Sequence, residues 1–224
     1  MVRKILVLLA MVGLALAAVG CLFDQNPVAV ISTLGRVQPG QSVLADGGSS
    51  YSPGGTAITN FEWNFGDGTP VVSSGTSAIS HSYALGGDYL LTLVVTNQFG
   101  SRSSPSTAMV SVNHRPVAAA KVSQEDLPAG QVVYILRQGV RPEAVILEGI
   151  ILVPAEYWKL DASVSYDLDG VIASYHWRWA DHDFGASPVI WVRVPSGSIY
   201  TLILEVFDNE GARGWSQVNI GAIG

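Results

Sequence analysis

Apolar and polar residues alternate along most of the chain beyond residue 26, in short runs separated by turn-forming clusters. Every second residue from Tyr89 to Val95 is aromatic or aliphatic, so these side chains would share one face of a strand running to Asn97. Similar runs occur at Val28–Ser32, Phe61–Phe65 and Ala108–Val112. No stretch beyond residue 21 keeps a helical periodicity for three turns. The pattern predicts an all-β fold.

The pattern occurs twice, which indicates two domains of similar structure. The recurring segments are Pro27–Val30 with Pro116–Ala119, Phe61–Phe65 with Tyr175–Trp179, and Tyr89–Gly100 with Tyr200–Gly211, the last pair at a constant offset of 111 residues. Each unit of roughly 90–110 residues has the length of one immunoglobulin-like sandwich. We therefore predict two β-sandwich domains in tandem, at residues 27–113 and 116–224.

The second unit contains extra residues at about 132–153. Two apolar runs, Val132–Leu136 and Ala144–Leu147, flank the turn-like segment Gly139–Pro142, which predicts an inserted hairpin. This hairpin could close an edge of its own sandwich or the groove between the domains. It could instead offer a free edge to a partner.

Residues 1–21 have the pattern of a secretion signal. Arg3 and Lys4 precede an uncharged apolar run, Ile5–Val19, which would span about 22 Å as a helix and is short for a bilayer core of about 30 Å. Cys21 is the only cysteine and follows small residues, in an arrangement similar to the lipobox of bacterial lipoproteins. The resemblance implies lipidation at Cys21, a tether at residues 22–26 and a membrane-anchored lipoprotein of the cell envelope, facing the periplasm or the exterior. A plain secretion signal is the alternative.

The charge of the chain narrows the possible partners. Charged residues make up 13% of the sequence, the formal net charge is −6, and loss of residues 1–21 would remove two cations and no acid. Nucleic-acid binding needs clustered cations, so we expect no nucleic-acid partner.

Several motifs of the first unit resemble the polycystic-kidney-disease (PKD) domain family. Trp63–Gly68 is similar to the family's W-D-F-G-D-G signature, with Asn64 in place of aspartate, and His81-Ser82-Tyr83 is similar to its H-x-Y motif. The second unit is looser: it keeps Tyr166–Gly170 but lacks the Gly-Asp-Gly turn and H-x-Y. The resemblance implies immunoglobulin-like sandwiches, usually extracellular, that serve adhesion, spacing or protein contact.

Two carboxylates, Asp167 and Asp169, lie on one loop of the second unit beside Gly170. The family resemblance implies a candidate calcium site there, because this D-x-D-G loop binds calcium in some relatives. Calcium takes six to eight oxygen ligands, so a third acid is needed, either Asp161 or Asp181. An ordinary Asx turn without metal is the alternative. The first unit has Ser52 and Gly54 at the corresponding positions, so we predict no metal there.

No motif for catalysis is found. The run Asp181-His182-Asp183 places neighbouring side chains on opposite sides and favours a solvated loop, while His81 is expected to form structural hydrogen bonds. There is no nucleophile elbow, zinc motif or phosphate-binding loop. A cryptic hydrolase built on Asp167, Asp169 and Asp181 stays the remote alternative to a protein that is not an enzyme.

The tryptophans divide into two groups. Trp63 with Phe65, and Trp177 with Trp179, are spaced by two and are expected in the sandwich cores. Trp158, Trp191 and Trp215 are candidate sugar-stacking residues, with packing as the alternative. The sequence favours a non-catalytic envelope protein that presents two domains for interaction or spacing, with a protein or a glycan as its unidentified partner. A carbohydrate-binding accessory module of a polysaccharide-degrading system is the second hypothesis.

Overall fold

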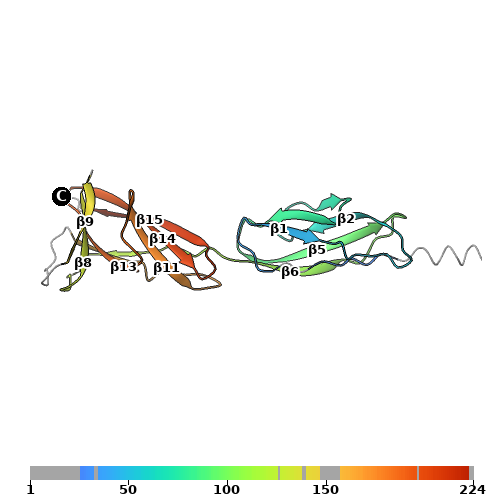
Figure 1. Cartoon of the computed structure of the whole chain (residues 1–224), viewed down its shortest axis with the longest axis horizontal. Coiled ribbons are helices and arrows are strands. Elements are labelled where there is room, and N and C mark those ends of the chain that lie inside the picture. The colour runs from blue at the N-terminus through green and yellow to red at the C-terminus, as the bar shows by residue number, and fades with distance from the viewer. Residues whose placement is uncertain are drawn as a thin grey trace, which may run out of the picture. The chain divides into compact units, whose positions relative to one another are not determined.

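The computed structural model describes residues 26–32, 35–125, 127–137, 140–146, 157–195 and 197–221, and it divides into two compact units at Val112 and Asn113 (Figure 1). These residues form strands, turns and loops, and none of the described segments is a helix long and apolar enough to cross a membrane. The predicted leader with Cys21, nearly all of the tether and the second part of the predicted insertion lie outside the described residues. The all-β immunoglobulin-like fold is confirmed.

The first unit contains two antiparallel sheets. The larger sheet has the order β3 (Val72–Ser74), β2 (Ile58–Asn64), β5 (Gly87–Asn97) and β6 (Ser106–Val112), and the smaller sheet pairs β1 (Ser42–Asp46) with β4 (Ala78–Ser82). The predicted strand at Val28–Ser32 is wrong, since only an isolated bridge joins Val28 to Tyr51. The Val30 amide donates a hydrogen bond to the Ser50 hydroxyl oxygen, where a strand partner would offer a backbone carbonyl.

The first core lies between these sheets. Leu91, Leu93 and Val95 on β5 are 0% exposed, as their alternation predicts, and Tyr89 is half-buried. Trp63 on β2 lies opposite Leu93 and is also fully buried. Burying a leucine or valine side chain contributes about 1.5–3 kcal/mol to stability, so the alternating residues of β5 hold the two sheets together.

The second unit repeats the larger sheet with the order β12 (His182–Asp183), β11 (Ile172–Trp179), β14 (Ile199–Asp208) and β15 (Arg213–Gly221). Trp177 lies opposite Leu204, as Trp63 lies opposite Leu93 in the first unit. The other sheet has five strands, in the order β7 (Lys121–Ser123), β10 (Tyr157–Asp161), β13 (Val189–Arg193), β8 (Val132–Arg137) and β9 (Val140–Ile146). Its core again lies between the two sheets.

The inserted hairpin is made by β8 and β9. Strand β8 pairs in parallel with β13, so the hairpin extends the sheet of its own unit. Leu136 on β8 is fully buried in the main core, and Val133 packs with Leu127 and Trp191 in a small second cluster. The hairpin therefore covers the edge of β13 in its own sandwich, and β9 becomes the outer strand of that sheet.

Candidate functional site

The predicted acidic loop lies immediately before β11, where the first residues of the second unit meet it. The Asp169 carboxylate accepts hydrogen bonds from the His114 amide at 3.1 Å and lies 3.0 Å from His114 Nδ1. Asp208, at the end of β14 and opposite Ile172, is 3% exposed and was not singled out from the sequence. It accepts hydrogen bonds from Asn113 Nδ2 and from the Glu210 and Ala212 amides, each at 2.8 Å.

Asp167 differs from these two acids. Both of its carboxylate oxygens are buried, and neither accepts a hydrogen bond of normal geometry from the described residues. Burial raises the pKa of Asp167, the negative charges of Asp169 and Asp208 raise it further, and the Asp169 amide offsets only part of this increase. A Cβ at Gly170 would meet the ends of the Asp167 and Asn209 side chains, so a larger residue there would require these side chains to move.

The other two predicted calcium ligands lie elsewhere. Asp161 ends β10, accepts a hydrogen bond from the Ser163 amide at 2.9 Å and has its pKa lowered by that bond first and also by the charges of Lys159 and Lys121. Asp181 follows β11, whereas Asp167 precedes it, and the eight residues of that strand span about 26 Å. The prediction that Asp181 joins the loop is therefore wrong, and the hydrolase hypothesis loses its third acid.

The carboxylates near this loop differ in how far their oxygens are already engaged. Asp208 is the nearby third acid, but its oxygens and those of Asp169 already accept bonds from protein donors. Asp167 has two oxygens without a hydrogen-bond partner among the described residues, so the rest of the six to eight ligands of calcium would have to come from other oxygens. Among the described residues, no three His, Cys, Asp or Glu side chains are grouped as a metal site.

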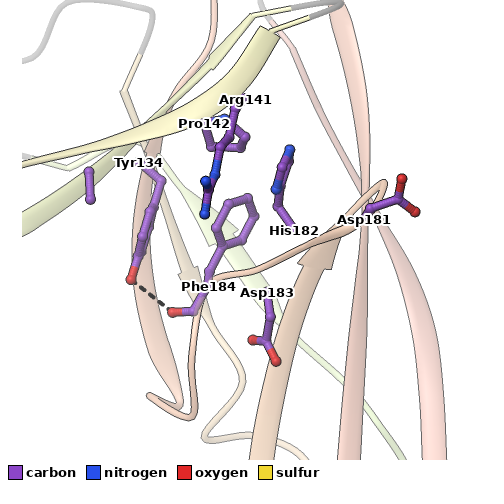
Figure 2. A pocket seen from close by; sticks show the side chains of 8 residues that line it. Tyr134, Arg141, Pro142, Asp181, His182, Asp183 and Phe184 are labelled. Carbon is purple, nitrogen blue, oxygen red and sulfur yellow. Dashed lines mark hydrogen bonds between the residues drawn. The ribbon is translucent and has the colours of Figure 1, made fainter.

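A pocket of about 420 Å³ lies between the inserted hairpin and the turn that joins β11 to β12 (Figure 2). Two of its lining residues, Tyr134 and Phe184, hold each other in place. The Tyr134 hydroxyl donates to the Phe184 carbonyl at 2.8 Å, and the centres of the two rings lie 4.7 Å apart. Figure 2 shows the Arg141 and His182 side chains beside these two rings, with the Asp181 carboxylate directed away from them. The remaining lining residues are Pro142, Ala144 and Asp183.

The chemistry of this pocket suits binding. Arg141 and His182 offer hydrogen-bond donors, while Asp183 is engaged by the Gly185 amide at 2.7 Å and lies 3.4 Å from His176 Nδ1. Its described lining contains no serine, threonine or cysteine that could act as a nucleophile. The run Asp181-His182-Asp183, expected to be a solvated loop, includes the short strand β12 because Ala180 turns the chain with a φ of 49°.

The three candidate sugar-stacking tryptophans have different environments. Trp191 is 5% exposed, because the inserted hairpin and Leu127 cover the outer side of β13. Its prediction as a ligand-binding residue is therefore wrong. Trp158 packs half-buried against the main core with a buried Nε1, so less of its ring is open to solvent than that of Trp215. Trp215 on β15 is 58% exposed.

His81 of the first unit forms structural contacts. Its Nε2 lies 2.8 Å from Asp67 Oδ2, and its ring stacks on Phe65 at 3.8 Å. Burial opposes ionisation of Asp67, but bonds from Thr69 and His81 hold its pKa below the ordinary value. Burial raises the pKa of Tyr83 to about 12, so this residue stays protonated and donates to the Phe65 carbonyl at 3.2 Å.

The W-x-F-G-D-G segment of the first unit therefore forms a turn held by its own side chains. Asn64 Oδ1 accepts a hydrogen bond from the Gly66 amide at 3.0 Å, and Asp67 accepts one from Thr69 at 3.1 Å. Gly66 has a φ of 76°, and a Cβ there would lie 2.6 Å from the Leu90 carbonyl oxygen. Only glycine meets both conditions, which explains the motif's central residue.

Comparisons with known proteins agree with this geometry. Residues 24–112 match the model of the PKD domain family. The structure of the PKD1 domain of Vibrio anguillarum Epp is 30% identical, and the match covers 39% of this chain and 96% of that domain, with a TM-score of 0.32. The chain belongs to the PKD domain family.

Other solved structures are similar to this PKD protein over most of its length. The fibronectin(III)-like modules of Clostridium thermocellum CbhA are 18% identical, with 87% of this chain and 94% of that chain covered and a TM-score of 0.32. Promiscuous carbohydrate-binding modules of the β-sandwich superfamily are 17% identical, with coverages of 88% and 85% and a TM-score of 0.39.

Proposed function

We propose that this PKD protein is a non-catalytic, lipid-anchored component of a bacterial cell envelope that binds a partner through its second unit. The observation that carries the proposal is the use of its histidine–carboxylate pairs. Two of the three pairs among the described residues, His81 with Asp67 and His114 with Asp169, hold turns and loops in place and do not line the pocket. In the third pair His176 lies 3.4 Å from Asp183, which lines the pocket and also accepts a hydrogen bond from the Gly185 amide. The second unit adds to its sandwich a hairpin, a pocket and an exposed tryptophan, which are features suited to binding.

The anchor at Cys21 is supported by the leader pattern and by the absence of any other cysteine. Several acyl chains, at about 0.8 kcal/mol per buried CH₂, would hold the protein stably on a membrane. The test is metabolic labelling with radioactive palmitate of bacteria that express the wild type or Cys21→Ala. We expect label and membrane association in the wild type alone. Equal labelling of both proteins, or labelling of neither, would contradict the anchor.

The non-catalytic role has its own test. Purified protein should show no turnover in a broad profile of esterase, glycosidase, peptidase and phosphatase substrates. Turnover that persisted in the purified protein and disappeared in His182→Ala would contradict the proposal and place an active site in the pocket. His182→Ala, purified by the same procedure and assayed in parallel, controls for contaminating enzymes.

A role as a carbohydrate-binding accessory module is the second candidate. The observation that favours it is the ring of Trp215, which is 58% exposed. An exposed aromatic ring can stack on the apolar face of a sugar. Binding to a glycan, in place of a protein, would distinguish this function from the first.

A further inference from the structure

The sheet β12-β11-β14-β15 has one face in the core and the other in solvent. Trp177, Leu204 and Val218 point into the core. The alternate residues of the same strands point outward. They include the polar His176, Arg178, Glu205, Arg213 and Gln217, the exposed Trp215, and the partly buried apolar Ile203 and Phe207. Trp215, Arg213 and Arg178 on this outer face are 58%, 52% and 45% exposed.

Trp215 lies on the edge strand of this sheet, directly opposite Glu205 on β14. Directly opposite residues of an antiparallel pair have their side chains on the same face. On the far side of Glu205, His176 occupies the next place in the same row across the sheet. The row His176, Glu205, Trp215 therefore crosses the outer face.

Glu205 is 8% exposed although it lies on the solvent side of the sheet. Two arginines cover it: Arg213 Nη1 lies 2.9 Å from Glu205 Oε1, and Arg178 Nη1 lies 3.4 Å from Oε2. The side chains of Arg213 and Arg178 are themselves 52% and 45% exposed. Each guanidinium has five N–H donors, so each keeps donors beyond the one that contacts Glu205. Arg213 lies two residues from Trp215 on the same strand face, whereas Arg178 lies on β11.

The charges of this face cancel. Arg178 and Arg213 carry two positive charges, and Glu205 and Asp183, which lies opposite Arg178, carry two negative ones. The neighbours of Trp215 on its own strand face are Arg213 and Gln217, which are polar. The face thus combines one exposed aromatic ring with fixed, neutralised hydrogen-bonding groups. Such a surface is complementary to a ligand that is uncharged and rich in hydroxyl groups.

We propose that the outer face of this sheet binds a neutral polysaccharide, with a pyranose ring stacked on Trp215 and its hydroxyl groups bonded by Arg213 and Gln217. The inference rests on the proposed binding role of the second unit and names its ligand class. A protein partner is less suited, because the exposed neighbours of the ring on its own strand, Arg213 and Gln217, are polar, whereas a protein interface has an apolar centre. An acidic polysaccharide is also less suited, because this face has no net positive charge to attract it. The chain as a whole has a formal net charge of −6 and would repel it.

The first unit provides an internal comparison. At the repeat offset of 111 residues, Val94 occupies the position of Glu205 and Ser104 that of Trp215. Arg102, at the position of Arg213, is bound instead by Glu62, with Nη2 and Oε2 2.6 Å apart. The first unit therefore has neither the ring nor the paired arginines, and the proposal assigns the ligand to the second unit alone.

The experiment is a titration of the full-length protein with four neutral hexasaccharides, of β-1,4-linked glucose, N-acetylglucosamine, xylose and mannose. Binding is followed by calorimetry and by tryptophan fluorescence. We expect at least one hexasaccharide to bind, Trp215→Ala to weaken it at least 10-fold without changing the thermal midpoint, and Trp215→Phe to weaken it less. Met109→Ala is the matched control, since Met109 is 59% exposed on the edge strand β6 of the first unit and should leave the affinity unchanged.

Three results would overturn the inference. The first is no binding of any hexasaccharide, and the second is binding that Trp215→Ala leaves intact. The third is binding of polygalacturonate alone that 0.5 M salt abolishes, which would indicate an anionic ligand. Palmitate labelling reports on Cys21 and the titration on Trp215, so failure of the glycan site is distinguishable from failure of the proposed anchor.

Discussion

At Asp167 the chain buries a carboxylate that receives no hydrogen bond of normal geometry from the described residues. Replacing it with asparagine removes the charge and keeps the shape, and the new amide can donate toward Asp169 or Asp208. We expect Asp167→Asn to raise the free energy of unfolding of the second unit by about 1 kcal/mol at pH 7, near the lower end of the cost of an unpaired buried polar group. Thermal unfolding would show this as a rise of about 4–8 °C.

The pH dependence of this gain has a definite sign. The pKa of Asp167 is raised in the folded state, so the wild type loses stability as the pH rises from the ordinary aspartate value through the higher folded value. The advantage of Asp167→Asn should therefore be full at neutral pH and vanish below the ordinary value. Asp181→Asn, an exposed acid beyond the far end of β11, is the control and should change little.

The same variant tests the calcium prediction. Without a cation in the loop, Asp167→Asn should be more stable than the wild type with or without millimolar calcium. If calcium raised the midpoint of the wild type and Asp167→Asn abolished that rise, the loop would be a cation site. The open oxygens of Asp167 would then be the first ligands to consider.

Asp208 shows a structural role that the two repeats share. In the first unit Asn97 has the corresponding position, and its Oδ1 accepts bonds from the Phe99 and Ser101 amides at 3.0 Å. Asp208 Oδ1 does the same for residues 210 and 212. We expect Asp208→Ala to cost about 2–4 kcal/mol, since several buried donors lose their acceptor, and Asp208→Asn to cost clearly less. Equal losses in urea unfolding would contradict a capping role.

These residues also show what the sequence could predict. The alternation from Tyr89 to Val95 places side chains on a face, and the burial of Leu91, Leu93 and Val95 follows from it. The repeat offset pairs Asn97 with Asp208, but the pattern gives no sign that Asp208 lies beside Asp167, because strand pairing between β11 and β14 brings them together. The burial of Trp191 could not be predicted for a related reason. In a strand covered on both faces, buried and exposed residues no longer alternate.

At the scale of elements, the inserted hairpin belongs to the structure of the second unit. Leu136 on β8 is fully buried in the main core, so Leu136→Ala would leave a cavity where the hairpin packs. We expect a loss of about 2–5 kcal/mol in urea unfolding. Ile146→Ala on β9 is the matched control, because Ile146 is 66% exposed and its loss should change stability by less than about 0.5 kcal/mol. A negligible effect of Leu136→Ala would show that the hairpin is dispensable.

The position of the hairpin was only half predictable from sequence. Two apolar runs around Gly139–Pro142 indicate paired strands. The first of these strands, β8, pairs in parallel with β13, in which Trp191 lies opposite Val133, 58 residues earlier (191 − 133), and no local pattern specifies such a pairing. The pocket has the same origin, since its lining comes from β8, β9 and the turn at β12.

At the scale of the whole molecule, each unit has a hydrophobic core of its own. Leu93 and Leu204 correspond at the repeat offset, both are 0% exposed, and each lies opposite the central tryptophan of its core. Because the two cores contain different residues, we expect calorimetry of the full chain to show two unfolding transitions.

Leu93→Ala and Leu204→Ala should each lower a different transition, by the equivalent of about 2–5 kcal/mol, and leave the other in place. The pair is closely matched in residue type, burial and strand position, so a difference in the size of the two shifts would report on the surrounding core. A single transition that both variants lower together would mean that the units unfold as one. Two independent transitions would mean that the binding unit can be altered, at Trp215 or in its hairpin, without loss of the PKD domain that precedes it.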